Sequence, residues 1–200
     1  MKYPENINQL VDIQPDYMGF IFYPKSKRFM ADSLDSEILK AIPKSIKKVG
    51  VFVNESAEVI LSMVEKFRLD LIQLHGNESS DFCNMLYINK LILIKAFQLH
   101  QKFDFGTLEN YKSSCQYFLF DTQTPLYGGS GHKFDWKILY HYDNDKPFFL
   151  SGGIDLEDAH KILNIKNLNI HAIDINSKFE IEPGMKNIEK VKKFKDLLTQ

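Results

Sequence analysis

The sequence predicts an α/β protein whose parallel strands are connected by helices. Short apolar runs alternate with amphipathic segments along all 200 residues, and within the runs apolar and polar positions show little alternation. Strands buried on both faces are continuously apolar in this way, and helices between such strands make parallel β/α units with right-handed crossovers. With 44% hydrophobic residues and no linker or shift of composition, we expect one domain over residues 1–200.

Seven apolar runs are predicted to be strands, because they are short and nearly continuous. They span residues 16–22, 48–53, 70–74, 91–97, 116–121, 147–150 and 170–173.

About eight amphipathic segments are predicted to be helices. In the first, Ile7, Leu10 and Val11 follow Pro4 at helical spacing, and proline suits a first helical turn. Residues 101–114 have a weak pattern. The remaining segments span residues 38–42, 59–67, 82–86, 136–139, 156–163 and 188–198.

This order of elements leaves two architectures open. One is a doubly wound open sheet. The other is a (β/α)8 TIM barrel with one strand unaccounted for, and the count of elements favours it. In both architectures ligands bind at the carboxyl ends of the strands, so polar residues and glycines at those ends are the candidate functional residues.

Composition argues against several classes of protein. Lysine and arginine total 25 and aspartate and glutamate 26, so the basic excess typical of binding to nucleic acid or an anionic membrane is absent. The lysine-rich residues 186–195 fit the solvated face of a helix. Cys83 and Cys115 are too few for a disulfide framework, and we expect reduced thiols in the cytoplasm. The chain has neither a signal-peptide pattern nor a run near the ~20 apolar residues of a membrane helix.

Three side chains at predicted strand ends could bind a substrate or transfer a proton. Arg28 follows the first strand, and a guanidinium binds a carboxylate or phosphate through two parallel hydrogen bonds. His75 ends the third strand beside Gly76. Asp121 ends the fifth, where lost hydration favours the protonated form that a general acid needs. The simpler alternatives are that Arg28 is a surface residue, that His75 is structural and that Asp121 caps a helix or loop.

Two later strands end in small residues that suit an anion. Gly152 and Gly153 lie between a predicted strand and a helix, where successive N–H groups can bind phosphate. Asn176 and Ser177 follow the next strand. The loops after the last two strands of a barrel commonly bind phosphate, so we expect a phosphate site here.

A glycine-rich segment follows Asp121, and we expect it to be a mobile loop that covers a ligand, a flexible linker being the alternative. The sequence has no metal-ligand constellation, dinucleotide motif or P-loop lysine, so neither a metal nor a cofactor is expected. The loop residues are Gly128, Gly129, Ser130 and Gly131.

The motifs occur in an order typical of one family. In this combination the chain resembles the phosphoribosylanthranilate isomerase family over nearly its whole length. The resemblance implies a (β/α)8 barrel and an isomerase of tryptophan biosynthesis that needs no metal or cofactor and binds a small-molecule substrate. The motifs lie at residues 16–28, 49–54, 73–78, 120–121, 128–136, 150–153, 174–180 and 183–184.

The resemblance also implies a reaction and residue roles. N-(5-phosphoribosyl)anthranilate would become 1-(2-carboxyphenylamino)-1-deoxyribulose 5-phosphate by an Amadori rearrangement. Asp121 would protonate the ribose ring oxygen, Arg28 would hold the anthranilate carboxylate, and His75 would line the same pocket. The phosphate would be bound by Gly152, Gly153, Asn176 and Ser177.

The sequence departs from the family pattern in two places. The family usually opens with a strand ending in Lys-x-Cys-Gly-Met, whose cysteine is the general base, and neither Cys83 nor Cys115 lies at a matching position. We therefore expect either a longer natural product that supplies strand one, or a barrel that binds a phosphosugar with impaired catalysis. Lys178 also replaces a glycine of the late motif. Indoleglycerol phosphate synthase, a related activity, would need a lysine acid and base, whereas only Lys95 ends a strand.

Overall fold

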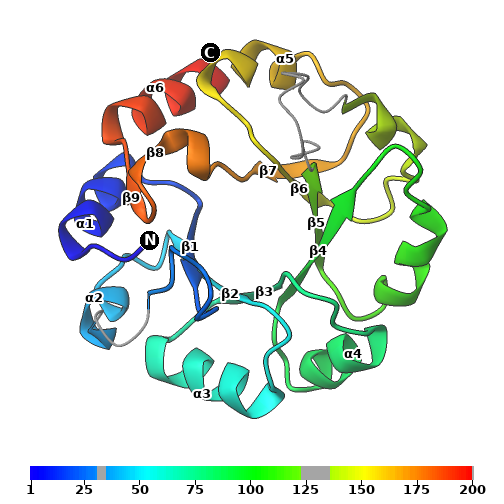
Figure 1. Cartoon of the computed structure of the whole chain (residues 1–200), viewed down its shortest axis with the longest axis horizontal. Helices are drawn as coiled ribbons and strands as arrows, with labels where there is room; N and C mark the ends of the chain where they lie inside the picture. Colours follow the sequence, from blue (N-terminus) through cyan, green and yellow to red (C-terminus); the bar gives the residue numbers. More distant parts are fainter. Residues whose placement is uncertain (31–34, 123–135, 200) are drawn as a thin grey trace.

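The computed structural model describes residues 1–30, 35–122 and 136–199, and its centre is one parallel sheet. Seven strands pair in chain order, each with the next, which confirms the seven strand predictions and the α/β class. Figure 1 shows the sheet curving around the axis of view, with the helices as an outer ring. The strands are β1 (Tyr17–Ile21), β2 (Lys47–Phe52), β3 (Leu71–Leu74), β4 (Leu93–Leu99), β5 (Tyr117–Thr122), β6 (Phe148–Ser151) and β7 (Ile170–Ile173).

The helices lie where the amphipathic segments predict them. Asp35, Ser56 and Ser79 each accept a backbone N–H with their side chains and so start a helix. The weakly patterned residues 101–114 contain a 3-10 helix, Phe105–Tyr111, rather than an α-helix, and the helix predicted at residues 136–139 is also a 3-10 helix. The helices are α1 (Pro4–Ile13), α2 (Ser36–Lys40), α3 (Ala57–Phe67), α4 (Ser80–Ile88), α5 (Ala159–Leu163) and α6 (Ile188–Leu198), with 3-10 turns η1 (Phe105–Tyr111), η2 (Trp136–His141), η3 (Leu156–Asp158) and η4 (Ser177–Phe179).

A short antiparallel hairpin between β7 and α6 is absent from the sequence prediction. Its strands are β8 (Glu180–Glu182) and β9 (Met185–Lys186), and the turn between them contains Gly184 at φ +91°. Glycine adopts this left-handed conformation at no steric cost, which explains the Pro-Gly pair at the turn.

The core has two layers, one between sheet and helices and one inside the curve of the sheet. The outer layer includes Phe20, Phe118 and Phe120. The inner layer contains Leu119 and Phe149, among others. Side chains alternate along a strand, so a residue two positions after an inner-layer residue also points to the inside of the curved sheet, at the strand's carboxyl end. Both cysteines are buried and free.

The two ends of the described chain lie side by side. Helix α1 contacts α6, and Lys195 of α6 donates to the carbonyls of Ile13 and Gln14. The backbone nitrogen of Met1 lies 3.1 Å from the carbonyl of Gly19 in β1. Within the described residues, the sheet contains seven strands, with β1 and β7 at its two edges. Beyond its pairing with β2, β1 makes a single parallel bridge, between Ile21 and Phe29. No described helix is long and apolar enough to span a membrane.

Candidate active site

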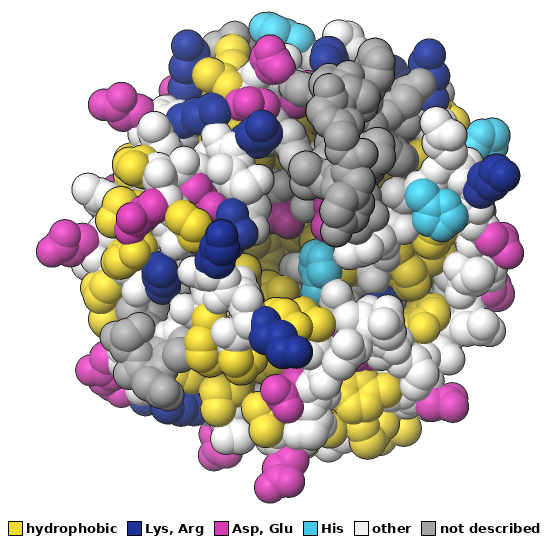
Figure 2. Space-filling model, viewed as in Figure 1, with side chains coloured by type: hydrophobic (Ala, Val, Ile, Leu, Met, Phe, Trp, Pro, Cys, Tyr) yellow, Lys and Arg dark blue, Asp and Glu magenta, His cyan; other side chains and the backbone are white. Residues whose placement is uncertain are grey.

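The carboxyl ends of the strands bring together polar side chains from β3, β5, β6 and β7. His75 follows β3, Asp121 and Ser151 lie in β5 and β6, and Asp174 follows β7. Asp121 and Ser151 are register partners, and each lies two residues beyond a side chain of the inner core. They therefore point into the mouth of the curved sheet. Figure 2 shows one face of the molecule hollowed at its centre, with histidine and acidic side chains beside the hollow.

His75 and Asp121 face one another, as expected for residues that line one site. Nε2 of His75 lies 3.5 Å from Oδ2 of Asp121, and both side chains are about one-quarter exposed. Gln73 orients the imidazole through a 2.8 Å hydrogen bond between its Nε2 and Nδ1 of His75. Because the amide nitrogen can only donate, Nδ1 accepts and the proton of a neutral imidazole lies on Nε2, toward Asp121.

Asp174 is a second carboxyl group in the mouth, which the sequence reasoning did not single out. Ser151 Oγ donates a 2.9 Å hydrogen bond to Asp174 Oδ2. Burial raises the pKa of Asp174, while the bond from Ser151 and the charge of Lys186 act in the opposite direction. Its place directly after β7 could have identified it, since Asp121 was found by the same signal.

Arg28 lies on the loop after β1, where its guanidinium pairs with Glu180 of the hairpin. Nε donates to both carboxylate oxygens at 2.9 and 2.8 Å, and Nη2 donates to Oε2 at 2.6 Å. Glu180 therefore occupies one edge of the fork that was expected to bind substrate, and it does not engage Nη1. Sequence reasoning missed Glu180 as a partner because it lies 152 residues away along the chain.

The residues expected to bind phosphate follow the neighbouring strands β6 and β7. Gly152 and Gly153 have φ of 98° and 63°, and a Cβ at Gly153 would meet nothing within 4 Å. Asn176 and Ser177 are exposed, and Asn176 Oδ1 accepts a 2.8 Å hydrogen bond from Lys186 Nζ. Lys178 is not among the residues with positive φ, so this loop does not require the glycine of the family pattern there.

A buried ion pair supports the loop that carries His75. Lys95 points to the helix-facing side of β4, and its Nζ lies 3.1 Å from Oε2 of Glu78. Glu78 also accepts the backbone N–H groups of Asn54 and Gly76, which ties the loops after β2 and β3 together. Lys95 is thus structural, and it lies inside β4 rather than at the end of a strand as the sequence suggested, because β4 continues to Leu99.

The predicted covering loop lies outside the described residues. It comprises Gly128, Gly129, Ser130 and Gly131.

The fold is of the β/α type, with seven parallel strands curved as in a TIM barrel, and a histidine, carboxyl groups and glycine-containing loops lie at the carboxyl ends of those strands, where enzymes of this class carry their active sites. Residues 1–196 match the family described as N-(5'phosphoribosyl)anthranilate (PRA) isomerase. The chain belongs to this family.

Individual relatives agree with the family match. The chain is 45% identical over 200 residues to the N-(5'-phosphoribosyl)anthranilate isomerase of Parabacteroides distasonis, covering 97% of this chain and 88% of that protein. The crystal structure of phosphoribosyl anthranilate isomerase from Thermotoga maritima is similar, with a TM-score of 0.87 at 34% identity over 100% of this chain and 95% of that one. An isomerase in complex with reduced 1-(o-carboxyphenylamino)-1-deoxyribulose 5-phosphate has a TM-score of 0.85 at 30% identity, with the same coverage.

Proposed function

We propose that this member of the isomerase family converts N-(5'-phosphoribosyl)anthranilate to 1-(2-carboxyphenylamino)-1-deoxyribulose 5-phosphate in tryptophan biosynthesis, with Asp121 as the general acid. The observation that carries the proposal is the placement of Asp121 beside His75 in the mouth of the sheet, 3.5 Å apart. Gln73 holds Nδ1 of His75, and Nε2 of the same ring faces Asp121 and positions its carboxyl group.

The reaction is balanced within one substrate molecule. Asp121 donates a proton to the ribose ring oxygen, the C1–O bond breaks, and the lone pair of the anthranilate nitrogen forms a C1=N double bond. A base removes the C2 proton to give an enaminol, and the hydroxyl at C2 then loses its proton as C1 gains one, which leaves the C2 carbonyl group of the product. No atom or electron is gained or lost overall, and each step is a proton transfer that positioned groups accelerate.

The remaining residues would hold the two charged ends of the substrate. Glu180 does not engage Nη1 of Arg28, so Nη1 can donate a charge-assisted hydrogen bond to the anthranilate carboxylate. The glycines after β6 would bind the phosphate through backbone N–H groups, together with the polar loop after β7. These phosphate ligands are Gly152, Gly153, Asn176 and Ser177.

Replacing Asp121 with asparagine tests the assignment, because the amide keeps the shape and cannot give up an acidic proton. We expect Asp121→Asn to lower kcat by about 10²–10⁴-fold, the usual contribution of a general acid. Chromatographic measurement of product formation is the assay, and Asp81→Asn, an exposed change at the start of α4, is the control. Unchanged turnover in Asp121→Asn would remove Asp121 from the mechanism.

We further propose that a strand between β1 and β7 completes an eight-stranded barrel and supplies the cysteine base. The ring of helices closes where α1 contacts α6, while the sheet inside it pairs only from β1 to β7 within the described residues. The intact mass of the protein from its native cell tests this proposal: a mass equal to that of the 200 residues would refute it.

A further inference from the structure

The β8–β9 hairpin places two charged side chains, Glu180 and Lys186, between the two ends of the proposed substrate site. Glu180 accepts both Arg28 donors, and it also accepts the N–H of Gly184 at 3.1 Å. Its side chain is 4% exposed, whereas the charge it orients, Arg28, is 26% exposed. An almost buried carboxylate that fixes a partly exposed guanidinium is the geometry of a support for a binding residue.

Lys186 acts on the other end of the site. Its Nζ donates to the carbonyl of Asn176 at 3.1 Å and to Oδ1 of the same residue at 2.8 Å, and it lies 3.4 Å from both the carbonyl of Ile175 and Oε1 of Glu180. One ammonium group thus crosslinks the loop after β7 to the hairpin. Burial lowers the pKa of Lys186, and the charges of Glu180 and Asp174 oppose this effect.

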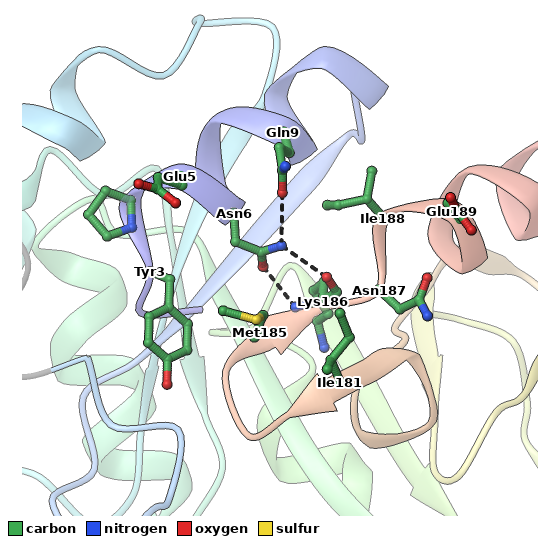
Figure 3. Close-up of a pocket in the computed structure, with 11 residues that line it drawn as sticks. Tyr3, Glu5, Asn6, Gln9, Ile181, Met185, Lys186, Asn187, Ile188 and Glu189 are labelled. Atoms are coloured by element: carbon green, nitrogen blue, oxygen red, sulfur yellow. Dashed lines mark hydrogen bonds between the residues drawn. The ribbon is translucent and has the colours of Figure 1, made fainter.

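The backbone of Lys186 is fixed by two hydrogen bonds to Asn6 of α1. Figure 3 shows Asn6 of α1 facing it: Asn6 Nδ2 donates to the Lys186 carbonyl at 2.9 Å, and the Lys186 N–H donates to Asn6 Oδ1 at 2.7 Å. This pair of bonds satisfies the backbone edge of β9 as a neighbouring strand would. The lysine side chain therefore extends from a fixed point, which limits the positions its ammonium group can reach.

We propose that Glu180 and Lys186 are positioning residues of this site, Glu180 for the carboxylate-binding Arg28 and Lys186 for the phosphate-binding loop at Asn176. The inference rests on the proposed function and extends it to residues that do not touch the substrate. Because Glu180 and Lys186 also contact each other, the hairpin links the two anion-binding ends and sets their separation.

Separate variants and two ligands test the two halves of the inference. Glu180→Gln keeps the shape and removes the charge that holds Arg28; Lys186→Met removes the ammonium group. We expect Glu180→Gln to raise the Kd for the reduced product analogue by roughly tenfold or more, while the Kd for ribulose 5-phosphate, which lacks the carboxyphenyl group, changes much less. Lys186→Met should weaken both ligands, because both carry the phosphate. Calorimetry gives each Kd.

Turnover distinguishes positioning from a catalytic role. Both variants should raise KM for the isomerase substrate by roughly tenfold, with a smaller change in kcat, because the acid Asp121 is untouched. Glu182→Gln, on the exposed side of the same hairpin, and Lys192→Met, exposed on α6, are matched controls that should keep the parent values. If Glu180→Gln does not fold, Glu180→Asp retains the charge but shortens its reach and should show the same rise in KM.

The outcomes separate the two proposals. The inference alone is overturned if the parent protein turns over the substrate and the folded variants have Kd and KM values within twofold of the parent values. A rise in the Kd for ribulose 5-phosphate in Glu180→Gln equal to that for the full analogue would also overturn it, because Glu180 would not act through Arg28. No turnover by a parent protein that carries the proposed strand and its cysteine overturns the proposed function and this inference with it.

Discussion

Lys95 and Glu78 are each only 3% exposed, so replacing Lys95 with methionine leaves a carboxylate buried without its cation. Lys95 Nζ also donates to the carbonyls of Gly76, Ala96 and Leu74 at 2.8, 3.1 and 3.3 Å. Methionine fills a similar volume, so the change removes charge and donors with little loss of packing.

We expect a loss in the free energy of unfolding of about 3 kcal/mol. Removing one partner of a buried ion pair costs about 3–5 kcal/mol, and the backbone N–H groups of Asn54 and Gly76 that Glu78 still accepts place the effect at the lower end. With a urea m-value of about 2–3 kcal/mol per molar, the midpoint should fall by about 1–1.5 M.

Urea unfolding followed by circular dichroism at pH 7 measures the loss. Adding Glu78→Gln to Lys95→Met removes the orphaned charge and should recover part of the stability, since the coupling of two contacting residues is not additive. Lys40→Met, which breaks the exposed pair with Glu37, should cost less than about 1 kcal/mol. A loss for Lys95→Met no larger than for Lys40→Met would refute the reasoning.

Two further changes test burial and packing. Asp174→Asn removes a carboxyl group whose pKa in the folded protein is raised by burial, so the substitution should stabilise the protein at pH values above the ordinary pKa of 3.8. At lower pH the advantage should disappear, because the carboxyl group is then protonated in both the folded and the unfolded chain. Thermal unfolding at pH 7 and at pH ~3 measures this, and an equal gain at both would contradict it. Gly50→Ala should destabilise by about 1–3 kcal/mol, because a Cβ would lie 2.5 Å from Leu69 Cδ1 and 2.8 Å from Phe52 Cε2; an unchanged denaturant midpoint would show that both neighbours move aside.

The strands were predictable because their signal is local. Each of the seven apolar runs overlaps a strand of the sheet. The hairpin was missed for the opposite reason: three and two residues, Glu180–Glu182 and Met185–Lys186, are too short for periodicity to register. The weak pattern at 101–114 also has a physical counterpart, since Asp104 accepts the N–H of Gly106 and starts a 3-10 helix that contains few apolar positions.

The candidate site was predictable where it depends on strand ends, and not where it depends on distant partners. His75 and Asp121 follow from the rule that function collects at the carboxyl ends of parallel strands. Glu180 does not, because a single sequence contains no signal that joins residue 180 to Arg28. Asp174 lay within reach of the same rule and would have been found had every residue that ends a strand been considered.

The pairing of strands in chain order has a consequence for how the protein folds during synthesis. Each strand meets its partner soon after both leave the ribosome, so the sheet can grow one β/α unit at a time. The contacts between Asn6 and Lys186, and between Arg28 and Glu180, span 180 and 152 residues and must wait until the chain is almost finished. A nascent chain stalled before residue 180 would therefore carry most of the sheet, while Arg28 would still lack the carboxylate that orients it.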